Sequence, residues 1–277
     1  RRLNTEFQAN WRYGPGPAPD QTTISERMHI RTQVKRAVSW EEHLRIHFAL
    51  RNLLRVTAWR PLNFASHEVM SDADPVRTAD GAAHGSQWLP VITHRTGVPT
   101  GAATKLSSWD LLFTFGDVGS RGVSRWLDVS ERFERGLTPL VGLLDLKGAS
   151  LEAHLAEVGI AYEMLGYDLL VEVGASNTRI KNANFVDLAG AVVAAVADVL
   201  PFAAGDFPEL LRRTYVGVKH ADSARPDRRE MNLAYRQAIQ VFRAWVAIRL
   251  GMSRKRLKVA LENDSLSHYI QRLASES

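Results

Sequence analysis

Arg213 and His220 lie seven positions apart in the stretch LLRRTYVGVKHADSARPD, residues 210–227. On an ideal α-helix seven steps turn about 700°, so the two side chains fall within about 20° of one face and about 10 Å apart along the axis. An arginine and a histidine facing one cleft can cleave a phosphodiester without a metal ion, because the guanidinium neutralises a phosphate oxygen while the imidazole moves a proton. RNA supplies its own nucleophile, the 2′-hydroxyl. Arg213 and His220 are therefore our candidate catalytic pair.

The spacing alone is weak support, because it occurs four times in the chain. The other copies are Arg36/His43, Arg60/His67 and Arg77/His84. Three features of context distinguish the last copy. It lies on a predicted helix of the basic segment, Gly217 allows that helix to end or kink near His220, and the all-helical half contains one suitable partner charge, Glu163.

Glu163 is the third catalytic candidate, because it is the sole charge within VGIAYEMLGY, residues 158–167. A carboxylate in such a setting is costly unless it is paired. We expect Glu163 to orient Arg213 or His220. A structural salt bridge is the alternative, and the two roles are compatible.

The charge is concentrated in the last quarter of the chain. Residues 205–277 hold 14 Lys/Arg and 8 Asp/Glu, a balance of +6, and the remainder carries −1 of the total +5. This distribution favours a polyanionic partner, with nucleic acid first and a solvated basic face as the alternative. The residues expected to bind RNA are Arg212, Thr214, Lys219 and Arg225.

Composition excludes several kinds of site. The chain has no cysteine, so disulfides, thiolate nucleophiles and cysteine-ligated zinc are absent, and a reducing compartment is favoured. His43 and His47 have a spacing that can chelate zinc, but the glutamate of the metalloprotease pattern is missing, and we favour a solvated helix face. We expect no metal and no cofactor. The apolar window 185–204 is interrupted by aspartates, which predicts a buried helix and no membrane span.

Helical periodicity covers most of the chain. Residues 39–59 open with a serine cap and two glutamates, which predicts an amphipathic helix. Residues 13–20, YGPGPAPD, are predicted to form a loop or arm. Short strands are predicted at 62–70, 87–95 and 109–118, followed by helical spacing at 124–144. Later helices are predicted at 151–172, 184–200, 207–220, 228–250, 253–262 and 266–274.

These elements predict an α+β protein with two domains. A composition shift near residues 138–150 separates a mixed α/β domain, residues 1–138, from an all-α domain, residues 139–277. The first domain begins without an initiator Met, so we expect it to be truncated at its start.

The order of several segments resembles a known family. FPELLRRTYVGVKHADSARPD, following the IAYEMLGYDLL helix, looks like the HEPN domain of the ApeA-like proteins of bacterial abortive phage defence. SWEEHLRIHFALRNLLRVTAWRPLNF and DLLFTFGDVGSRGVSRWLDVSERFERGLTPL are similar to the mixed domain that precedes HEPN in that family. The matching stretches span most of residues 39–250.

The resemblance implies a helical bundle that dimerises, with an Arg-x4–6-His motif from each subunit at a shared cleft. It implies a cytoplasmic, toxin-like ribonuclease that cuts RNA, including tRNA, without metal and leaves 2′,3′-cyclic phosphate ends. Arg213 and His220 map to the motif, and Glu163 falls on the helix that often carries a polar partner. A phage-derived trigger is implied, and no membrane. Thr214 departs from the Asn, His or Asp that usually follows the motif arginine.

Two other functions stay open at this stage. One is a catalytically inactive HEPN module that binds RNA or a protein and mediates dimerisation, an alternative favoured by Thr214 and by the frequency of the Arg-six-His spacing. The other is DNA binding through a helix–turn–helix around Gly251. The apolar run AYRQAIQVFRAWVAIRL argues against the latter, because an exposed recognition helix is not expected to be so apolar.

Overall fold

The computed structural model of the 277-residue chain describes residues 3–15, 20, 22–92, 107 and 110–275. Every strand that it describes precedes α2 (Phe115–Arg132), and the described residues after that point are helical or in connections, so the fold is α+β as predicted. The chain groups into two compact units, Arg1–Leu50 and Arg51–Ser277.

A long antiparallel hairpin builds the N-terminal unit. Its strands are β1 (Asn4–Pro15) and β2 (Thr22–Gln33), with Asn4 paired to Gln33 and Phe7 paired to Ile30. Of the predicted loop at 13–20, the first three residues end β1, and residues 16–19 lie outside the described part. The hairpin itself is absent from the sequence prediction.

Helix α1 (Trp40–Ala58) confirms the helix predicted at 39–59. Ser39 caps it, since its Oγ accepts a hydrogen bond from the backbone N–H of Glu42 at 3.4 Å. The helix ends at Trp59, whose φ of 48° is left-handed.

Two histidines of α1 bind one hydroxyl of β2. Thr32 Oγ1 lies 2.7 Å from His43 Nδ1 and 3.0 Å from His47 Nε2. A hydroxyl has one proton to donate and lone pairs to accept, so one imidazole can accept from it while the other donates to it. Burial lowers the pKa of His43, against the opposing charge of Glu42. His43 and His47 therefore tie β2 to α1 and do not form the fully solvated face that we predicted.

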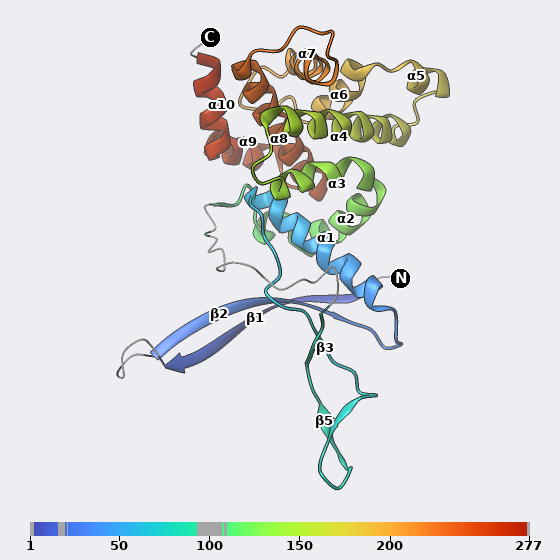
Figure 1. The fold of residues 1–277 in the computed structure, drawn as a ribbon, viewed down its shortest axis with the longest axis vertical. Helices are drawn as coiled ribbons and strands as arrows, with labels where there is room; N and C mark the ends of the chain where they lie inside the picture. The colour runs from blue at the N-terminus through green and yellow to red at the C-terminus, as the bar shows by residue number, and fades with distance from the viewer. Residues whose placement is uncertain (1–2, 16–19, 21, 93–106, 108–109, 276–277) are drawn as a thin grey trace. The chain divides into compact units, whose positions relative to one another are not determined.

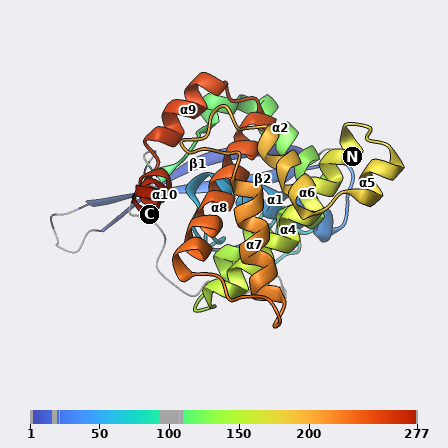
Figure 2. The same ribbon diagram turned by 90° about the horizontal axis from the view of Figure 1, so that it is seen from above.

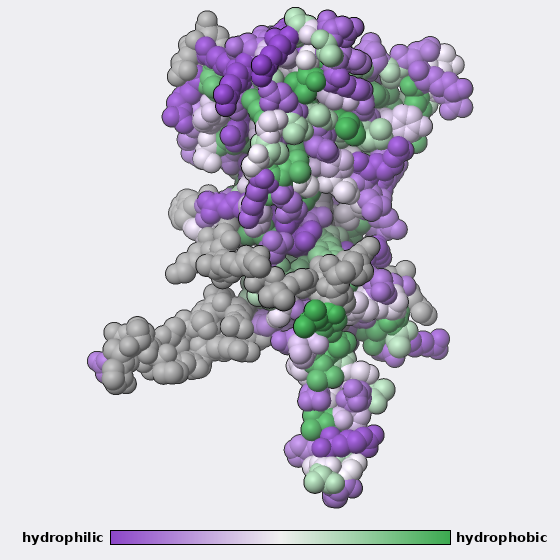
Figure 3. Space-filling view, in the orientation of Figure 1, coloured by the Kyte–Doolittle hydropathy of each residue, from purple (hydrophilic) through white to green (hydrophobic). Residues whose placement is uncertain are grey.

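Small ribbons follow α1. β3 (Glu68–Val69) pairs with β6 (Leu89–Pro90), and β4 (Pro75–Arg77) pairs with β5 (Ala83–Ser86). β3 and β6 lie within the strands predicted at 62–70 and 87–95. Apolar side chains are exposed on and beside the β3–β6 ribbon, where Figure 3 shows hydrophobic surface: Val69, Trp88, Leu89 and Ile92.

The strand predicted at 109–118 is wrong in its described residues. No strand forms there, and helix α2 begins at Phe115 behind a capping box, in which the Thr114 N–H donates to the Asp117 carboxylate at 2.8 Å. Leu112 and Phe113, which suggested a strand, are buried in the approach to this helix. A strong local cap thus determines the structure here, and the apolar run does not.

The remaining helices form a bundle (Figure 1). After α3 (Glu134–Gly142) and the short 3₁₀ helix η2 (Leu143–Asp145) come α4 (Leu151–Glu172), α5 (Asn177–Asn182), α6 (Phe185–Ala194), α7 (Phe207–Lys219), α8 (Arg228–Leu250), α9 (Arg254–Glu262) and α10 (Ser265–Ser275). The helices predicted at 151–172 and 228–250 are confirmed to the residue. Gly251 ends α8 in the left-handed region, with a φ of 97°.

The predicted domain boundary between residues 138 and 139 falls inside α3, which runs unbroken across it and packs against α4. The division of the chain into two domains, residues 1–138 and 139–277, stays a prediction.

Helix α8 is the centre of the bundle. Every residue from Gln237 to Ala247 is buried, because α2, α4, α6, α7, α9 and α10 all pack against it. Figure 2 shows α8 with α7, α4 and α6 beside it. A helix enclosed in this way cannot enter a DNA groove, so α8 is not a recognition helix.

The alanine-rich window at 185–204 contains α6. Asn184 and Asp187 form its capping box, and Asp198 forms an ion pair with Arg254. Both aspartates therefore have local partners. Within the described ranges no helix is both long and apolar enough to cross a lipid bilayer.

A buried arginine connects α8 to the end of α1 and to the α9–α10 connection. Arg243, whose side chain is 2% exposed, donates to the carbonyl oxygens of Val56 at 3.1 Å and Thr57 at 2.8 Å. Its Nη1 donates to both carboxylate oxygens of Asp264 at 3.1 Å. The guanidinium thus satisfies two helix-terminal carbonyls and one nearly buried carboxylate.

We expect Arg243→Ala to lower the free energy of unfolding by about 3–5 kcal/mol, because it leaves the Asp264 carboxylate buried without its cation. Urea unfolding followed by circular dichroism measures this loss. Arg179→Ala, at an exposed position of α5, is the control and is expected to change stability by no more than about 0.5 kcal/mol. A loss of less than about 1 kcal/mol in Arg243→Ala would contradict this role.

Candidate active site

Helix α7 presents one apolar and one charged side. Pro208 in its first turn suits a helix start, and Phe207, Leu211 and Tyr215 are buried against α4, α6 and α8. The helix ends at Lys219. His220 follows with extended backbone angles, φ −114° and ψ 120°.

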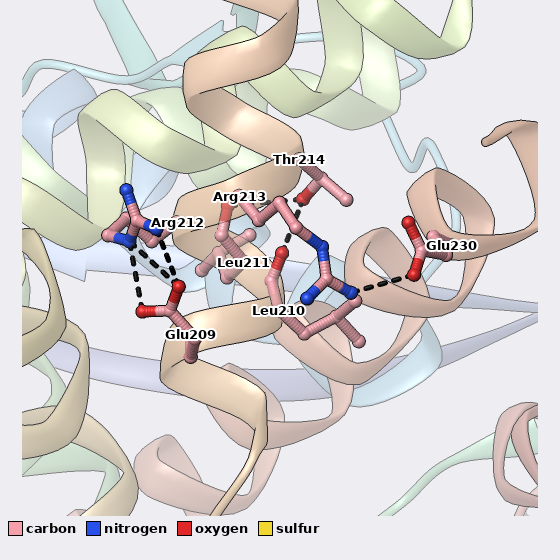
Figure 4. Close-up of polar contacts among 7 residues, drawn as sticks. All are labelled: Glu209, Leu210, Leu211, Arg212, Arg213, Thr214 and Glu230. Carbon is pink, nitrogen blue, oxygen red and sulfur yellow. Dashed lines mark hydrogen bonds and ion pairs between the residues drawn. The ribbon is translucent and has the colours of Figure 1, made fainter. Parts of the chain in front are cut away.

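Arg213 is exposed and held by an acidic side chain of α8. Its Nη2 donates to Glu230 Oε1 at 2.7 Å, and the Arg213 side chain keeps 52% of its surface exposed. Arg212 points to another carboxylate, that of Glu209, with Nη2 at 2.6 Å from Oε1. Figure 4 shows the two guanidinium groups on different sides of α7. The two adjacent arginines therefore have different partners.

His220 is exposed, and in the described part of the chain its imidazole has no hydrogen bond or ion pair. Its backbone N–H donates to the carbonyl of Val216 at 3.0 Å and closes the last turn of α7. Because His220 has left the helical conformation, the 20° estimate for an ideal helix does not fix its side-chain direction. The imidazole is exposed and can meet a ligand from solvent.

Thr214 does not lie on the charged side. It is fully buried, and its hydroxyl donates within α7 to the carbonyl oxygens of Leu210 at 2.9 Å and Leu211 at 3.1 Å (Figure 4). The RNA-binding role expected for Thr214 therefore finds no support in this geometry. A β-branched residue fits here because its methyl group packs inward while the backbone satisfies its hydroxyl.

The charge of Glu163 acts on Lys219 of α7. A hydrogen bond to Tyr215 and the charge of Tyr215 raise the pKa of Lys219. The charge of Glu163 raises it further, by a smaller amount. Lys219 Nζ lies 3.3 Å from Tyr215 Oη. No hydrogen bond or ion pair among the described residues joins Glu163 to Arg213 or His220. The electrostatic effect of Glu163 on α7 thus falls on Lys219.

The connection between α7 and α8 carries Arg225 and packs tightly on α7. Arg225 Nη2 donates to Glu152 Oε1 of α4 at 3.0 Å. Pro226 lies against Gly217, where an added methyl group would be 2.6 Å from Pro226 Cγ and 2.9 Å from the Ala224 oxygen. Gly217 does not kink α7, which continues to Lys219. Its lack of a side chain lets the connection approach the helix between Arg213 and His220.

The other Arg-six-His copies have different surroundings. His43 contacts Thr32, as described above. His67 is buried against the ring of Phe64, with the ring centroids 4.5 Å apart, and burial lowers the pKa of His67. Arg77 and His84 are exposed, but on β4 and β5. Of the four copies, the one at 213 and 220 lies on and directly after a single helix, with both side chains exposed.

A second basic segment, at the start of α9, is partly neutralised. Arg254 pairs with Asp198, and Arg256 pairs with Asp117 at 2.6 Å. Lys255 and Lys258 are exposed. Across the described residues, no group of three or more acidic or histidine side chains is arranged to hold a metal ion.

Glu230 and Glu152 are absent from the sequence prediction. They lie 17 and 73 residues from Arg213 and Arg225, the arginines that they bind. Glu230 also sits in the first turn of α8, where an acidic residue is expected for the helix alone. No periodicity in the sequence indicates these pairs.

Comparison with protein families matches residues 2–126 to a model described as ApeA N-terminal domain 1. The N-terminal segment is ApeA-like. The predicted resemblance is thereby confirmed for this segment. The match ends within α2, before the helices that carry Arg213 and His220. No curated protein and no solved structure matches the chain.

We predict opposite effects for two glycine-to-alanine substitutions in the helical region. Gly217→Ala is expected to destabilise by about 1–3 kcal/mol, because Pro226 and a backbone oxygen must move. Gly190→Ala, in α6, meets nothing within 4 Å and is expected to stabilise by up to about 1 kcal/mol. Thermal unfolding measures both. Equal shifts would show that the connection does not pack on Gly217 as described.

Proposed function

We propose that this chain is a metal-independent RNA endonuclease of the HEPN type that acts in abortive anti-phage defence. The observation that carries the proposal is the joint exposure of Arg213 and His220 on and directly after α7, in a segment that also carries Lys219, Arg225, Arg228 and Arg229. The ApeA-like N-terminal segment supports the defence role. In this proposal it senses a phage-derived trigger or restrains the nuclease.

In the proposed reaction the 2′-oxygen of a ribose attacks the adjacent phosphorus. The new O2′–P bond forms as the P–O5′ bond breaks, which yields a 2′,3′-cyclic phosphate and a 5′-hydroxyl. A neutral imidazole of His220 takes the 2′-proton, and an imidazolium returns a proton to the 5′-oxygen. In the homodimer that we propose, the two copies of His220 share these roles.

Arg213 stabilises the charge that develops on the phosphorane. Its pair with Glu230 is compatible with this role, because both side chains are about half exposed, at 52% and 43%. Such surface pairs contribute only about 0–1 kcal/mol, so an incoming phosphate can replace the carboxylate. Arg212, Lys219 and Arg225 are proposed to contact the strand. Glu163 is proposed to act only through Lys219.

The alternative is an inactive HEPN module that binds RNA or a protein partner and mediates dimerisation. Two observations favour this alternative. Thr214 is buried, and Arg213 forms an ion pair with Glu230. Both functions require a basic surface at α7, so binding alone does not separate them.

We predict that His220→Ala and Arg213→Ala each reduce cleavage of total tRNA in EDTA by at least about 100-fold, since each removes a group that acts on the transition state. Cleavage is measured on denaturing gels, and fragment ends are tested for cyclic phosphate. The matched controls are His268→Ala on α10 and Arg179→Ala on α5, both exposed and distant in sequence from α7. Full cleavage by His220→Ala would reject the mechanism, and RNA binding without any cleavage by the unmodified chain would favour the inactive module.

A further inference from the structure

A cavity of about 260 Å³ lies between the start of α4 and the connection from α7 to α8. Its lining includes Ser150, Glu152, Arg225, Pro226, Arg228 and Met231. This volume is below the roughly 300–1,000 Å³ of pockets for drug-sized ligands, so it suits a small group. We infer that this cavity is a subsite for one backbone phosphate of the RNA strand, away from the bond that is cut. The inference rests on the proposed function for the identity of its ligand.

The charges of the cavity favour a phosphate. Arg228 is exposed and has no ion pair among the described residues. Arg225 is paired with Glu152, but its side chain is 83% exposed, so the pair is weak and exchangeable. A phosphate diester offers two oxygens to a guanidinium, whereas Glu152 makes a single contact to Arg225, so a phosphate can replace this carboxylate.

Two helix starts meet at this cavity. Ser150 is the N-cap of α4, and Arg228 is the first residue of α8 behind its cap, Asp227. The positive ends of both helix dipoles therefore lie at the cavity. Asp227 accepts hydrogen bonds from the N–H groups of Arg229 and Glu230, so the dipole assists the arginines and does not replace them.

The cavity adjoins the candidate pair through two contacts. Pro226, in its wall, packs on Gly217 of α7, between Arg213 and His220. Glu230, which holds Arg213, lies in the same first turn of α8 as Arg228. A strand that passes Arg213 and His220 can therefore place a neighbouring phosphate in the cavity. Glu152 then acts as the acidic group that the phosphate displaces.

Binding of a fluorescent single-stranded RNA with 2′-O-methyl riboses tests this inference in EDTA, because such RNA cannot be cut by 2′-attack. We expect the RNA affinity of Glu152→Gln to be about five times that of Glu134→Gln. Glu134→Gln is the control, because it removes an exposed carboxylate on α3. Arg228→Ala is expected to weaken binding about fivefold and to lower the slope of log affinity against log salt by about 0.7, as for one lost phosphate contact. Arg179→Ala is its control.

Equal effects of Glu152→Gln and Glu134→Gln, or an unchanged salt slope in Arg228→Ala, would overturn the subsite. So would binding of inorganic phosphate at the cavity together with no effect of these variants on RNA. The outcome is independent of catalysis. If these shifts occur in a chain that cuts no RNA, the subsite stands and the nuclease fails; if the chain cuts RNA and the variants bind normally, the nuclease stands and the subsite fails.

Discussion

The buried guanidinium of Arg243 is the interaction on which the arrangement of the helical region depends. It joins α8 to the last carbonyls of α1 and to Asp264 between α9 and α10. Because α8 is enclosed by its neighbours, fixing α8 also fixes its first turn, which carries Arg228 and Glu230. Helix α7 packs on α8, and this contact brings Arg213 to Glu230. A buried structural arginine thus positions the exposed arginine for which we propose a catalytic role.

Several basic side chains of the C-terminal quarter are paired with carboxylates. Arg212, Arg213 and Arg225 each bind a carboxylate, from α7, α8 and α4 respectively. All three pairs are exposed to solvent, so each is weak and sensitive to salt. These pairs lower the attraction of the surface for a single small anion. A strand with several correctly spaced phosphates, in contrast, can displace several carboxylates together. Specificity for a polyanion then follows from the number of pairs exchanged.

Local signals in the sequence predicted most of the helices, whereas pairings between distant segments were not predictable. The helix at 228–250 is bounded by Asp227 and Gly251, whose capping roles are readable from residue type. The β1–β2 hairpin has a signal in the sequence, since Phe7, Ala9 and Trp11 alternate with polar residues, but the prolines at 15, 17 and 19 favour a loop or arm. Arg213 and His220 are both exposed, and their catalytic role stays a prediction. The burial of Thr214 and the pairing of Arg213 with Glu230 depend on how α7 packs, which spacing along one helix does not encode.

The most direct test of the account uses an RNA with one 2′-deoxyribose. The cleavage site of the unmodified chain is first mapped on a short RNA in EDTA, and the ribose whose 2′-oxygen would attack is then replaced by deoxyribose. The account predicts that the substituted linkage stays intact while other sites are cut as before, because the nucleophile is missing at that linkage only. Cleavage of the deoxy linkage at an undiminished rate would contradict attack by the 2′-hydroxyl and with it the role proposed for His220.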